Sequence, residues 1–281
     1  MIRKPLVVAI IALLMILGKK KIFGIRFERL KTQINCEEET LVNKDNKEFH
    51  IKVSDYIADK LSDQGCDIVF GVSGGASLHL LKSIEDHPEL QLITVHHEQT
   101  VSMAAEAYAR MTGRLGVGIV TSGPGATNLA TGVAGAYFDS IPCLFFTGQV
   151  STFRRSNGLG VRQYGFQETN TVDIFKSISK RVFSLNETSS LPSLFSESIK
   201  EIFKGRPGPV IIDVPDNLQR EILDSHVIGN IIERPGDYDE VNRGSKFIEC
   251  LNIVEQLLSE SKSPVIICGW GTMLSGQKSN S

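Results

Sequence analysis

A chain of 281 residues can form one large or two ordinary domains, and its 41% apolar residues are enough to fill a hydrophobic core. The 30 basic and 32 acidic residues give a formal net charge of −2, and no basic cluster is interleaved with aromatic residues. We therefore expect a soluble globular protein that does not bind nucleic acid.

The five cysteines are odd in number and widely spread, and no C-x-x-C pair indicates zinc or a redox couple. We expect buried thiols in a reducing compartment, which favours the cytoplasm. The residues are Cys36, Cys66, Cys143, Cys250 and Cys268.

Residues 1–48 form an N-terminal extension in which residues 6–17 are apolar and follow Arg3 and Lys4. This run is too short to cross a hydrocarbon core as a relaxed helix, and no small-x-small cleavage site follows it. Membrane association through residues 6–17, as an uncleaved anchor or signal, stays open beside the favoured interpretation of a non-essential extension or a mis-set start codon. Residues 19–48 are polar, and we expect them to be poorly ordered.

From residue 53 onward, helical and strand patterns alternate. Val53, Ile57 and Leu61 have helical spacing, and Gly65 is placed to end that helix. An apolar run then leads into a serine and two glycines, which predicts a strand, a turn and a helix start. The predicted strands are 67–72, 90–95, 117–121, 143–147 and 209–215, and further helices are predicted at 99–111, through the small residues of 130–136, and around 194–203.

This alternation predicts an α/β fold with a parallel sheet flanked by helices on both faces. Ligands of such folds bind at the carboxyl ends of the strands, where Gly74, Glu98 and Gly123 fall. Residues 151–165 carry three arginines and several glycines, and they predict a long functional or mobile loop.

We assign the first domain to residues 49–223. Residues 224–244 are polar and predict a linker. Residues 245–281 then predict one helix and one strand at 263–269, as the truncated start of a second α/β domain. A single strand cannot bury a core, so we expect the chain to be cut off.

Glu98 ends the apolar run 92–97 at the point where a helix begins. A carboxylate at the end of a buried strand lies in a low dielectric and is suited to share a proton with a ring nitrogen near neutral pH. The alternative is that Glu98 caps the helix, where the positive end of the dipole favours its charge. Position alone favours the cap.

The neighbouring patterns give weaker signals. His96 and His97 are adjacent and would point to opposite faces of a strand, so a core or helix-start role is favoured over metal binding. Glu106 and Arg110 are four residues apart and predict a solvated ion pair. The glycine-rich segments 71–75 and 123–128 match neither a phosphate-binding loop nor G-x-G-x-x-G, because Asn128 stands where the third glycine belongs.

Taken together and in order, eight segments resemble the pyrimidine-binding domain of thiamine-diphosphate enzymes of the acetolactate synthase (large subunit) type. The resemblance covers roughly residues 51–220 and is specific as a set. The segments are 71–77, 97–98, 105–110, 121–128, 139–142, 147–149, 166–168 and 205–215.

The resemblance implies a 2-keto acid decarboxylating and carboligating enzyme, acting on pyruvate in branched-chain amino acid biosynthesis. It implies that Glu98 hydrogen-bonds the pyrimidine N1′ of thiamine diphosphate and favours the imino tautomer that removes the thiazolium proton. Gly74 and Gly75 would let the backbone approach the pyrimidine, and Phe166 and Gln167 would line the substrate side. Arg206 falls where flavin-using members place an arginine that contacts FAD.

Two departures from the family pattern concern the substrate. Ser73 replaces the usual proline, and the loop 151–165 is longer and richer in arginine, so another keto acid is possible. The family's Gly-Asp-Gly and paired asparagines, which hold Mg²⁺ and the diphosphate, occur nowhere in the sequence. We therefore expect the magnesium ligands on a missing domain, and either a homodimer or a separate diphosphate-binding subunit as partner. A non-catalytic dimerising or ligand-binding fragment and, at lower odds, a Rossmann-type nucleotide-binding domain are the alternatives.

Overall fold

The computed structural model describes residues 50–223, 245–267, 269 and 271. The chain divides into two compact units, one spanning residues 48–242 and the other combining 1–47 with 243–281. The predicted extension, with its apolar segment 6–17, and the predicted linker 224–244 lie outside the described residues.

One parallel sheet of six strands organises the described part of the first unit, in the order β3-β2-β4-β5-β7-β6. All five predicted strands occur, with limits shifted by at most two residues. The sixth, β6, was not predicted. The strands are β2 (Ile68–Gly71), β3 (Gln91–Thr94), β4 (Gly116–Val120), β5 (Cys143–Gln149), β6 (Arg181–Ser184) and β7 (Val210–Pro215).

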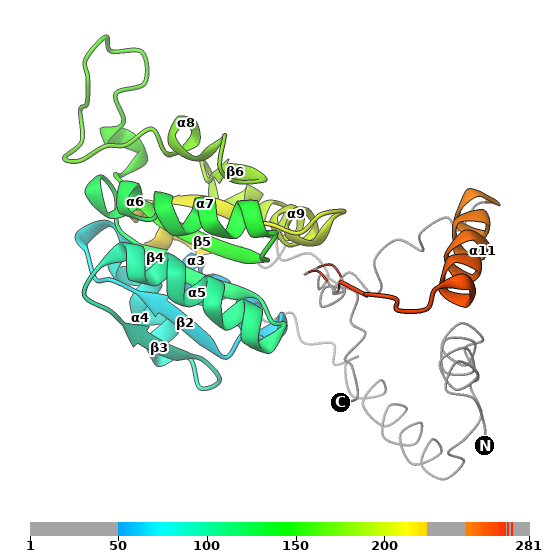
Figure 1. The fold of residues 1–281 in the computed structure, drawn as a ribbon. Coiled ribbons are helices and arrows are strands. Elements are labelled where there is room, and N and C mark those ends of the chain that lie inside the picture. Colours follow the sequence, from blue (N-terminus) through cyan, green and yellow to red (C-terminus); the bar gives the residue numbers. More distant parts are fainter. Residues whose placement is uncertain (1–49, 224–244, 268, 270, 272–281) are drawn as a thin grey trace. The chain divides into compact units, whose positions relative to one another are not determined.

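Helices cover both faces of this sheet, as predicted (Figure 1). One face carries α3 (Val53–Asp63), α4 (Leu78–Asp86) and α9 (Leu191–Phe203), and the other carries α5 (Glu98–Thr112) and α7 (Ala130–Asp139), which lie side by side. Short segments join the layers: η2 (Gly75–Ser77), α6 (Pro124–Asn128), η3 (Thr152–Arg154), α8 (Thr171–Phe175), η4 (Thr188–Ser190) and α10 (Asp216–Arg220).

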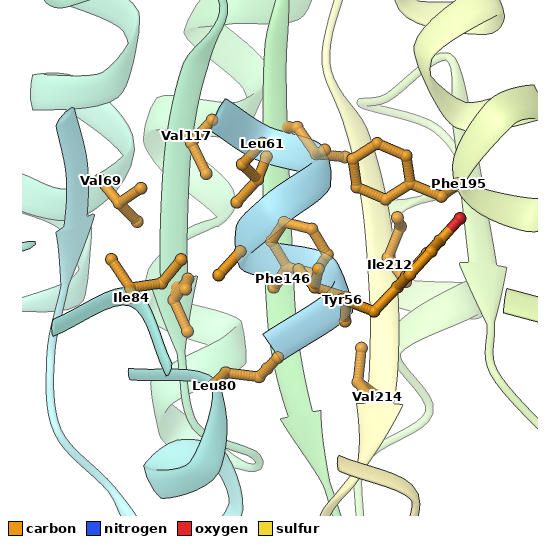
Figure 2. Close-up of a cluster of buried hydrophobic side chains, with 14 of the residues drawn as sticks. Tyr56, Leu61, Val69, Leu80, Ile84, Val117, Phe146, Phe195, Ile212 and Val214 are labelled. Atoms are coloured by element: carbon orange, nitrogen blue, oxygen red, sulfur yellow. The ribbon is translucent and has the colours of Figure 1, made fainter. Parts of the chain in front are cut away.

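The main core lies between the sheet and the layer of α3, α4 and α9. Figure 2 shows ten labelled side chains of this cluster: Tyr56, Leu61, Val69, Leu80, Ile84, Val117, Phe146, Phe195, Ile212 and Val214. On the other face, Phe145 is also fully buried. The central strands are thus covered on both sides, which explains their near-continuous apolar sequences.

The strand that precedes Glu98 is not buried as predicted. Among the residues that the structure describes, β3 is an edge strand that pairs only with β2, so Gln91 and Thr94 are exposed and Leu92 and Ile93 are half-buried. Its apolar sequence was typical of a central strand, but its position in the sheet leaves one long edge without a partner.

A two-stranded antiparallel ribbon joins the two ends of this unit. β1 (Ile51–Lys52) pairs with β8 (Ile222–Leu223), with Ile51 opposite Leu223. The sequence did not predict this ribbon, because a strand of two residues has no periodicity to detect. The five-residue helices α8 and α10 were not predicted either, because they are also too short to show a periodic pattern.

In the second unit, α11 (Ser245–Glu260) confirms the predicted helix. The strand predicted at 263–269 is wrong over residues 263–267, which form no strand. A strand is stable only when its backbone pairs with a neighbour, and the described part of this unit offers none. In the described ranges, no helix is long and apolar enough to span a membrane.

The prediction of buried thiols is confirmed for two of the three described cysteines. Cys66 and Cys143 are buried free thiols, and burial raises the pKa of Cys66 to about 12 and raises that of Cys143 as well. These thiols are therefore unreactive at neutral pH. Cys250 on α11 is exposed, which contradicts the prediction for that residue, and Cys36 and Cys268 lie outside the described residues.

Candidate functional site

The sequence left open whether Glu98 is the N-cap residue of helix α5 or a proton relay. Glu98 is the first residue of α5, and His97 is its N-cap residue. The Nδ1 atom of His97 accepts a hydrogen bond of 3.1 Å from the backbone N–H of Gln99. His97 therefore caps the helix, which confirms its predicted helix-start role and leaves the carboxylate of Glu98 available for other partners.

Glu98 is half-buried and is held from the side of α6. The Nδ2 atom of Asn128 donates a hydrogen bond of 2.9 Å to Oε2 of Glu98. The other oxygen, Oε1, lies beside Gly125, where an added Cβ would be 3.6 Å from it. One carboxylate oxygen is thus fixed and the other is left to interact with a further group.

Thr121, directly after β4, contacts the glycine loop after β2 and packs beside Gly125, the neighbour of this carboxylate. Its Oγ1 accepts a hydrogen bond of 3.2 Å from the backbone N–H of Ala76. A Cβ on Gly74 would lie 2.4 Å from the Cβ of Thr121, and a Cβ on Gly125 would lie 2.7 Å from its Cγ2. Both glycines are therefore required by close packing on one threonine.

Gly75 differs from Gly74 in its surroundings. No atom lies within 4 Å of the position that a Cβ on Gly75 would occupy. The fold itself therefore does not require a glycine at residue 75. The open space above its backbone is the observation that fits a ligand approaching the glycine loop closely.

Gln167 reaches the same region from a distant part of the chain. It has a left-handed backbone with φ of 57°, and a Cβ on Gly123 would lie 2.7 Å from the Cβ of Gln167. Gly123 itself has φ of 62° and opens the segment that carries Asn128. A left-handed conformation costs a non-glycine residue about 1 kcal/mol or more, so surrounding contacts must hold this turn.

The structure thus brings Gly74, Glu98 and Gly123 together at the carboxyl ends of the strands, where the sequence placed them, and Gln167 packs against Gly123. Phe166 belongs to the same turn as Gln167, and its side chain is 83% exposed.

Arg206 is not part of this group. Its guanidinium donates hydrogen bonds to the hydroxyl of Ser140 and, at 3.0 Å, to the carbonyl of Phe138. Ser140 ends α7 with φ of 62°, and both Ser140 and Arg206 precede their strands, β5 and β7. Arg206 therefore lies at the amino edge of the sheet, opposite Glu98, and stabilises the end of α7.

The loop 151–165 is tied at both ends by Glu168. Its Oε1 accepts hydrogen bonds of 2.7 and 2.8 Å from the backbone N–H and the hydroxyl of Ser156, and its Oε2 accepts one of 2.9 Å from the N–H of Tyr164. Partial burial acts to raise the pKa of Glu168, but these hydrogen bonds outweigh it and lower the pKa below its usual value. Residues 157–164 between these anchors are exposed.

This arrangement predicts that acid loosens the loop. The folded pKa of Glu168 is lowered, so its contribution to stability is present above the unfolded pKa and is lost as the pH falls through the folded pKa, which lies below the usual value of a glutamate. Hydrogen-exchange protection of the Ser156 and Tyr164 amides should fall over that range. In Glu168→Gln, protection should be low and independent of pH. Equal loss in wild type and variant would contradict the prediction.

Two further features of this region concern an ion pair on α5 and metal binding. Arg110 bonds Glu106, so the predicted ion pair forms, but it is half-buried and not solvated as predicted; Arg110 also reaches Asp139 at the end of α7. Among the described residues, no group of three or more histidine, cysteine, aspartate or glutamate side chains is arranged to hold a metal ion.

Asn128 and Thr121 are the site residues that sequence reasoning missed. Both belong to the segment 121–128 that carried the resemblance, but neither was assigned a role. In the sequence, Asn128 stands out only because it replaces the third glycine of G-x-G-x-x-G. The signal was its amide side chain, placed shortly after a strand whose carboxyl end faces Glu98.

The sequence is similar to known proteins of one family. The family model described as "Thiamine pyrophosphate enzyme, N-terminal TPP binding domain" matches residues 51–174. The acetolactate synthase large subunit of Lactococcus lactis is 39% identical over 223 residues, which cover 79% of this chain and 37% of that protein. A chloroplastic acetolactate synthase of Arabidopsis thaliana is 34% identical over 243 residues, covering 85% and 35%. A probable acetolactate synthase large subunit of Methanocaldococcus jannaschii is 36% identical over 228 residues, covering 80% and 37%.

The parallel sheet, the site at its carboxyl edge and the family match together show that the chain belongs to the thiamine pyrophosphate enzymes, through their N-terminal domain. Within that class it is of the acetolactate synthase type. The chain spans little more than a third of the length of the curated relatives it matches.

Proposed function

We propose that this chain provides the pyrimidine-binding half of the active site of an acetolactate synthase-like enzyme, which decarboxylates a 2-keto acid such as pyruvate and joins the product to a second one. The observation that carries the proposal is the carboxylate of Glu98, which is freed from capping by His97 and held on one oxygen by Asn128.

Glu98 would act as a proton relay. Asn128 fixes Oε2, so Oε1 is the oxygen that can share a proton with the pyrimidine N1′ atom. His97 fixes the first turn of the helix and with it the position of Glu98.

The residues present fit thiamine diphosphate at its pyrimidine end. The open space over Gly75 leaves room for a flat ring against the backbone, and Gly74 packs that loop onto Thr121. When bound, the cofactor supplies a nucleophilic carbon and an electron sink for decarboxylation. The protein's part is to orient the ring, exchange the proton at N1′ and, through Phe166 and Gln167, border the substrate.

The diphosphate end must be held elsewhere. We propose that the Mg²⁺ ligands lie outside the described residues, on a separate subunit or a further domain, and that the active site forms in a dimer. We propose no flavin contact at the Glu98 site, because Arg206 lies at the opposite edge of the sheet and its guanidinium is bonded within the domain. FAD would have to bind at that other edge. The proposed location is the cytoplasm.

Thiamine diphosphate binding, measured by calorimetry with Mg²⁺, tests the proposal. Wild type should bind, alone or together with the protein that supplies the magnesium site. Gly75→Ala should leave the free energy of unfolding nearly unchanged, because its Cβ enters open space, but should weaken binding by about tenfold or more. FAD and NAD⁺, titrated in parallel, test the flavin and nucleotide alternatives.

Gly74→Ala is the matched control. Its Cβ would overlap the Thr121 side chain, so the free energy of unfolding should fall by about 1–3 kcal/mol, with or without cofactor present. Absence of any binding by wild type, with and without its partner, would contradict the proposal. So would undiminished binding by Gly75→Ala.

A further inference from the structure

A buried polar cluster lies behind the turn that carries Phe166 and Gln167. Its centre is Asp213 on β7, which is 2% exposed. Oδ1 of Asp213 accepts hydrogen bonds from the hydroxyls of Thr147, at 2.7 Å, and Thr171, at 3.0 Å. Oδ2 accepts one of 3.0 Å from Nε2 of Gln149 and lies 3.7 Å from the guanidinium of Arg155.

The partners of Asp213 come from three different segments. Thr147 and Gln149 lie on β5, Thr171 starts α8, and Arg155 belongs to the loop 151–165. Every partner donates and Asp213 only accepts, so the ionised carboxylate matches the cluster. These segments surround the turn 165–169 in sequence and in space.

Gln149 connects this cluster to the turn. Its Nε2 donates to Asp213 and also, at 2.7 Å, to the carbonyl of Thr169. The hydroxyl of Thr169 in turn donates to the carbonyl of Gln167, at 3.0 Å. A continuous series of hydrogen bonds therefore leads from the buried carboxylate to the residue with the left-handed backbone.

We propose that Asp213, acting through Gln149, is the positioning residue that holds the Phe166–Gln167 turn in its left-handed conformation at the substrate side of the site. The role of the turn rests on the proposed function; the hydrogen bonds that hold it do not.

The buried, charged carboxylate of Asp213 is unfavourable for the free energy of folding. Its role is therefore better explained by positioning the turn than by stabilising the fold. Burial raises the pKa of Asp213, and the hydrogen bonds from Thr147, Gln149 and Thr171 and the charge of Arg155 only partly oppose this effect. For an acid whose folded pKa is raised, the ionised form destabilises the fold at neutral pH. Nη2 of Arg155 is also buried without a hydrogen-bond acceptor in the described part of the chain. An uncharged side chain of similar shape would relieve the first cost, but it would leave the guanidinium of Arg155, which is only 14% exposed, without its counter-charge.

Asparagine is the informative replacement because it preserves shape but reverses one hydrogen bond. Its oxygen can still accept from Thr147 and Thr171, so its NH₂ group must face Nε2 of Gln149, and two donors then oppose each other. Gln149 can satisfy that NH₂ group only by turning its amide over. Its Nε2 then no longer reaches the carbonyl of Thr169, and the turn loses its connection.

The experiment measures hydrogen exchange and thermal unfolding of Asp213→Asn in the full chain. Exchange of the Glu168 and Thr171 amides, which are hydrogen-bonded within the turn, should become about tenfold faster or more. A lower melting temperature with uniformly faster exchange would assign Asp213 a general structural role and overturn the proposal, as would unchanged exchange in the turn.

Two further variants keep the test decisive. Gln149→Met keeps the volume and removes the link to Thr169, so it should speed exchange in the turn even if Asp213→Asn does not fold. Ser198→Ala removes another buried hydroxyl, bonded to Leu194 within α9, and should leave the turn unchanged. If Gln149→Met leaves exchange in the turn at the wild-type rate, the proposal is wrong.

Kinetics separates this proposal from the proposed function. In the complete enzyme, Asp213→Asn should raise KM for pyruvate by about fivefold or more and leave thiamine diphosphate affinity within about twofold, because the Glu98 side is unaltered. If wild type binds no thiamine diphosphate, the proposed function fails, and the exchange data still decide the role of Asp213. Equal weakening of cofactor binding and KM would contradict a role confined to the turn.

Discussion

Glu98→Gln should lower acetolactate formation from pyruvate by about a hundredfold or more, measured with this chain and the protein that supplies the magnesium site. Glutamine keeps the shape of the side chain but cannot exchange a proton at N1′, and general acid–base groups contribute about 10²- to 10⁴-fold. Asn128 can still donate to the amide oxygen, so the fold and the melting temperature should change little.

Glu106→Gln is the control for this experiment. It makes the same chemical change on the same helix, where Glu106 pairs with Arg110. Activity should stay within about twofold of wild type, because a glutamine at this position can still accept the hydrogen bond of Arg110. Activity of Glu98→Gln equal to that of Glu106→Gln would remove the proton relay from the proposal.

Gly116→Ala should lower the stability of the fold strongly. A Cβ on Gly116 would lie 2.1 Å from the backbone carbonyl oxygen of Ala105, so α5 would have to move away from β4. We expect a loss of about 3 kcal/mol or more in the free energy of unfolding, because backbone cannot give way as a flexible side chain can. Chemical denaturation measures this. Because α5 begins with Glu98, a variant that does fold should also bind thiamine diphosphate more weakly.

Gly135→Ala tests whether that effect is specific to the strand. Its nearest neighbour is the end of the Glu106 side chain, at 3.3 Å, which can move. Alanine has the higher helix propensity, so this variant of α7 should be neutral or up to about 1 kcal/mol more stable. A similar loss in both variants would show that the contact with Ala105 is not the cause.

The sequence was sufficient to predict the central sheet because its strands are buried on both faces. The apolar runs of β4, β5 and β7 bear that out. The same criterion failed at β3, where an equally apolar run lies at an edge. Strand order depends on pairing between distant segments, and no local pattern records which strand has a neighbour on each side.

The sequence predicted where the site residues lie along the chain, but it did not predict which hydrogen bonds they make. Glu98 was placed correctly at the start of a helix, but the choice between cap and proton relay required His97 to be seen accepting from Gln99. The partner of Glu98, Asn128, is thirty residues away in sequence and is brought close only by the fold. The role of Asp213 could not be predicted, since its partners come from three separate segments.

The ribbon of β1 and β8 brings the two ends of the described range 50–223 together, with Ile51 opposite Leu223 and the N–H of Val53 bonded to the carbonyl of Glu221 at 2.9 Å. A unit whose chain enters and leaves at one point can be joined to different neighbours without disturbing its sheet. Residues 51–223 are therefore suited to transfer as a cassette between larger enzymes, and to circular permutation through a short bridge across the ribbon.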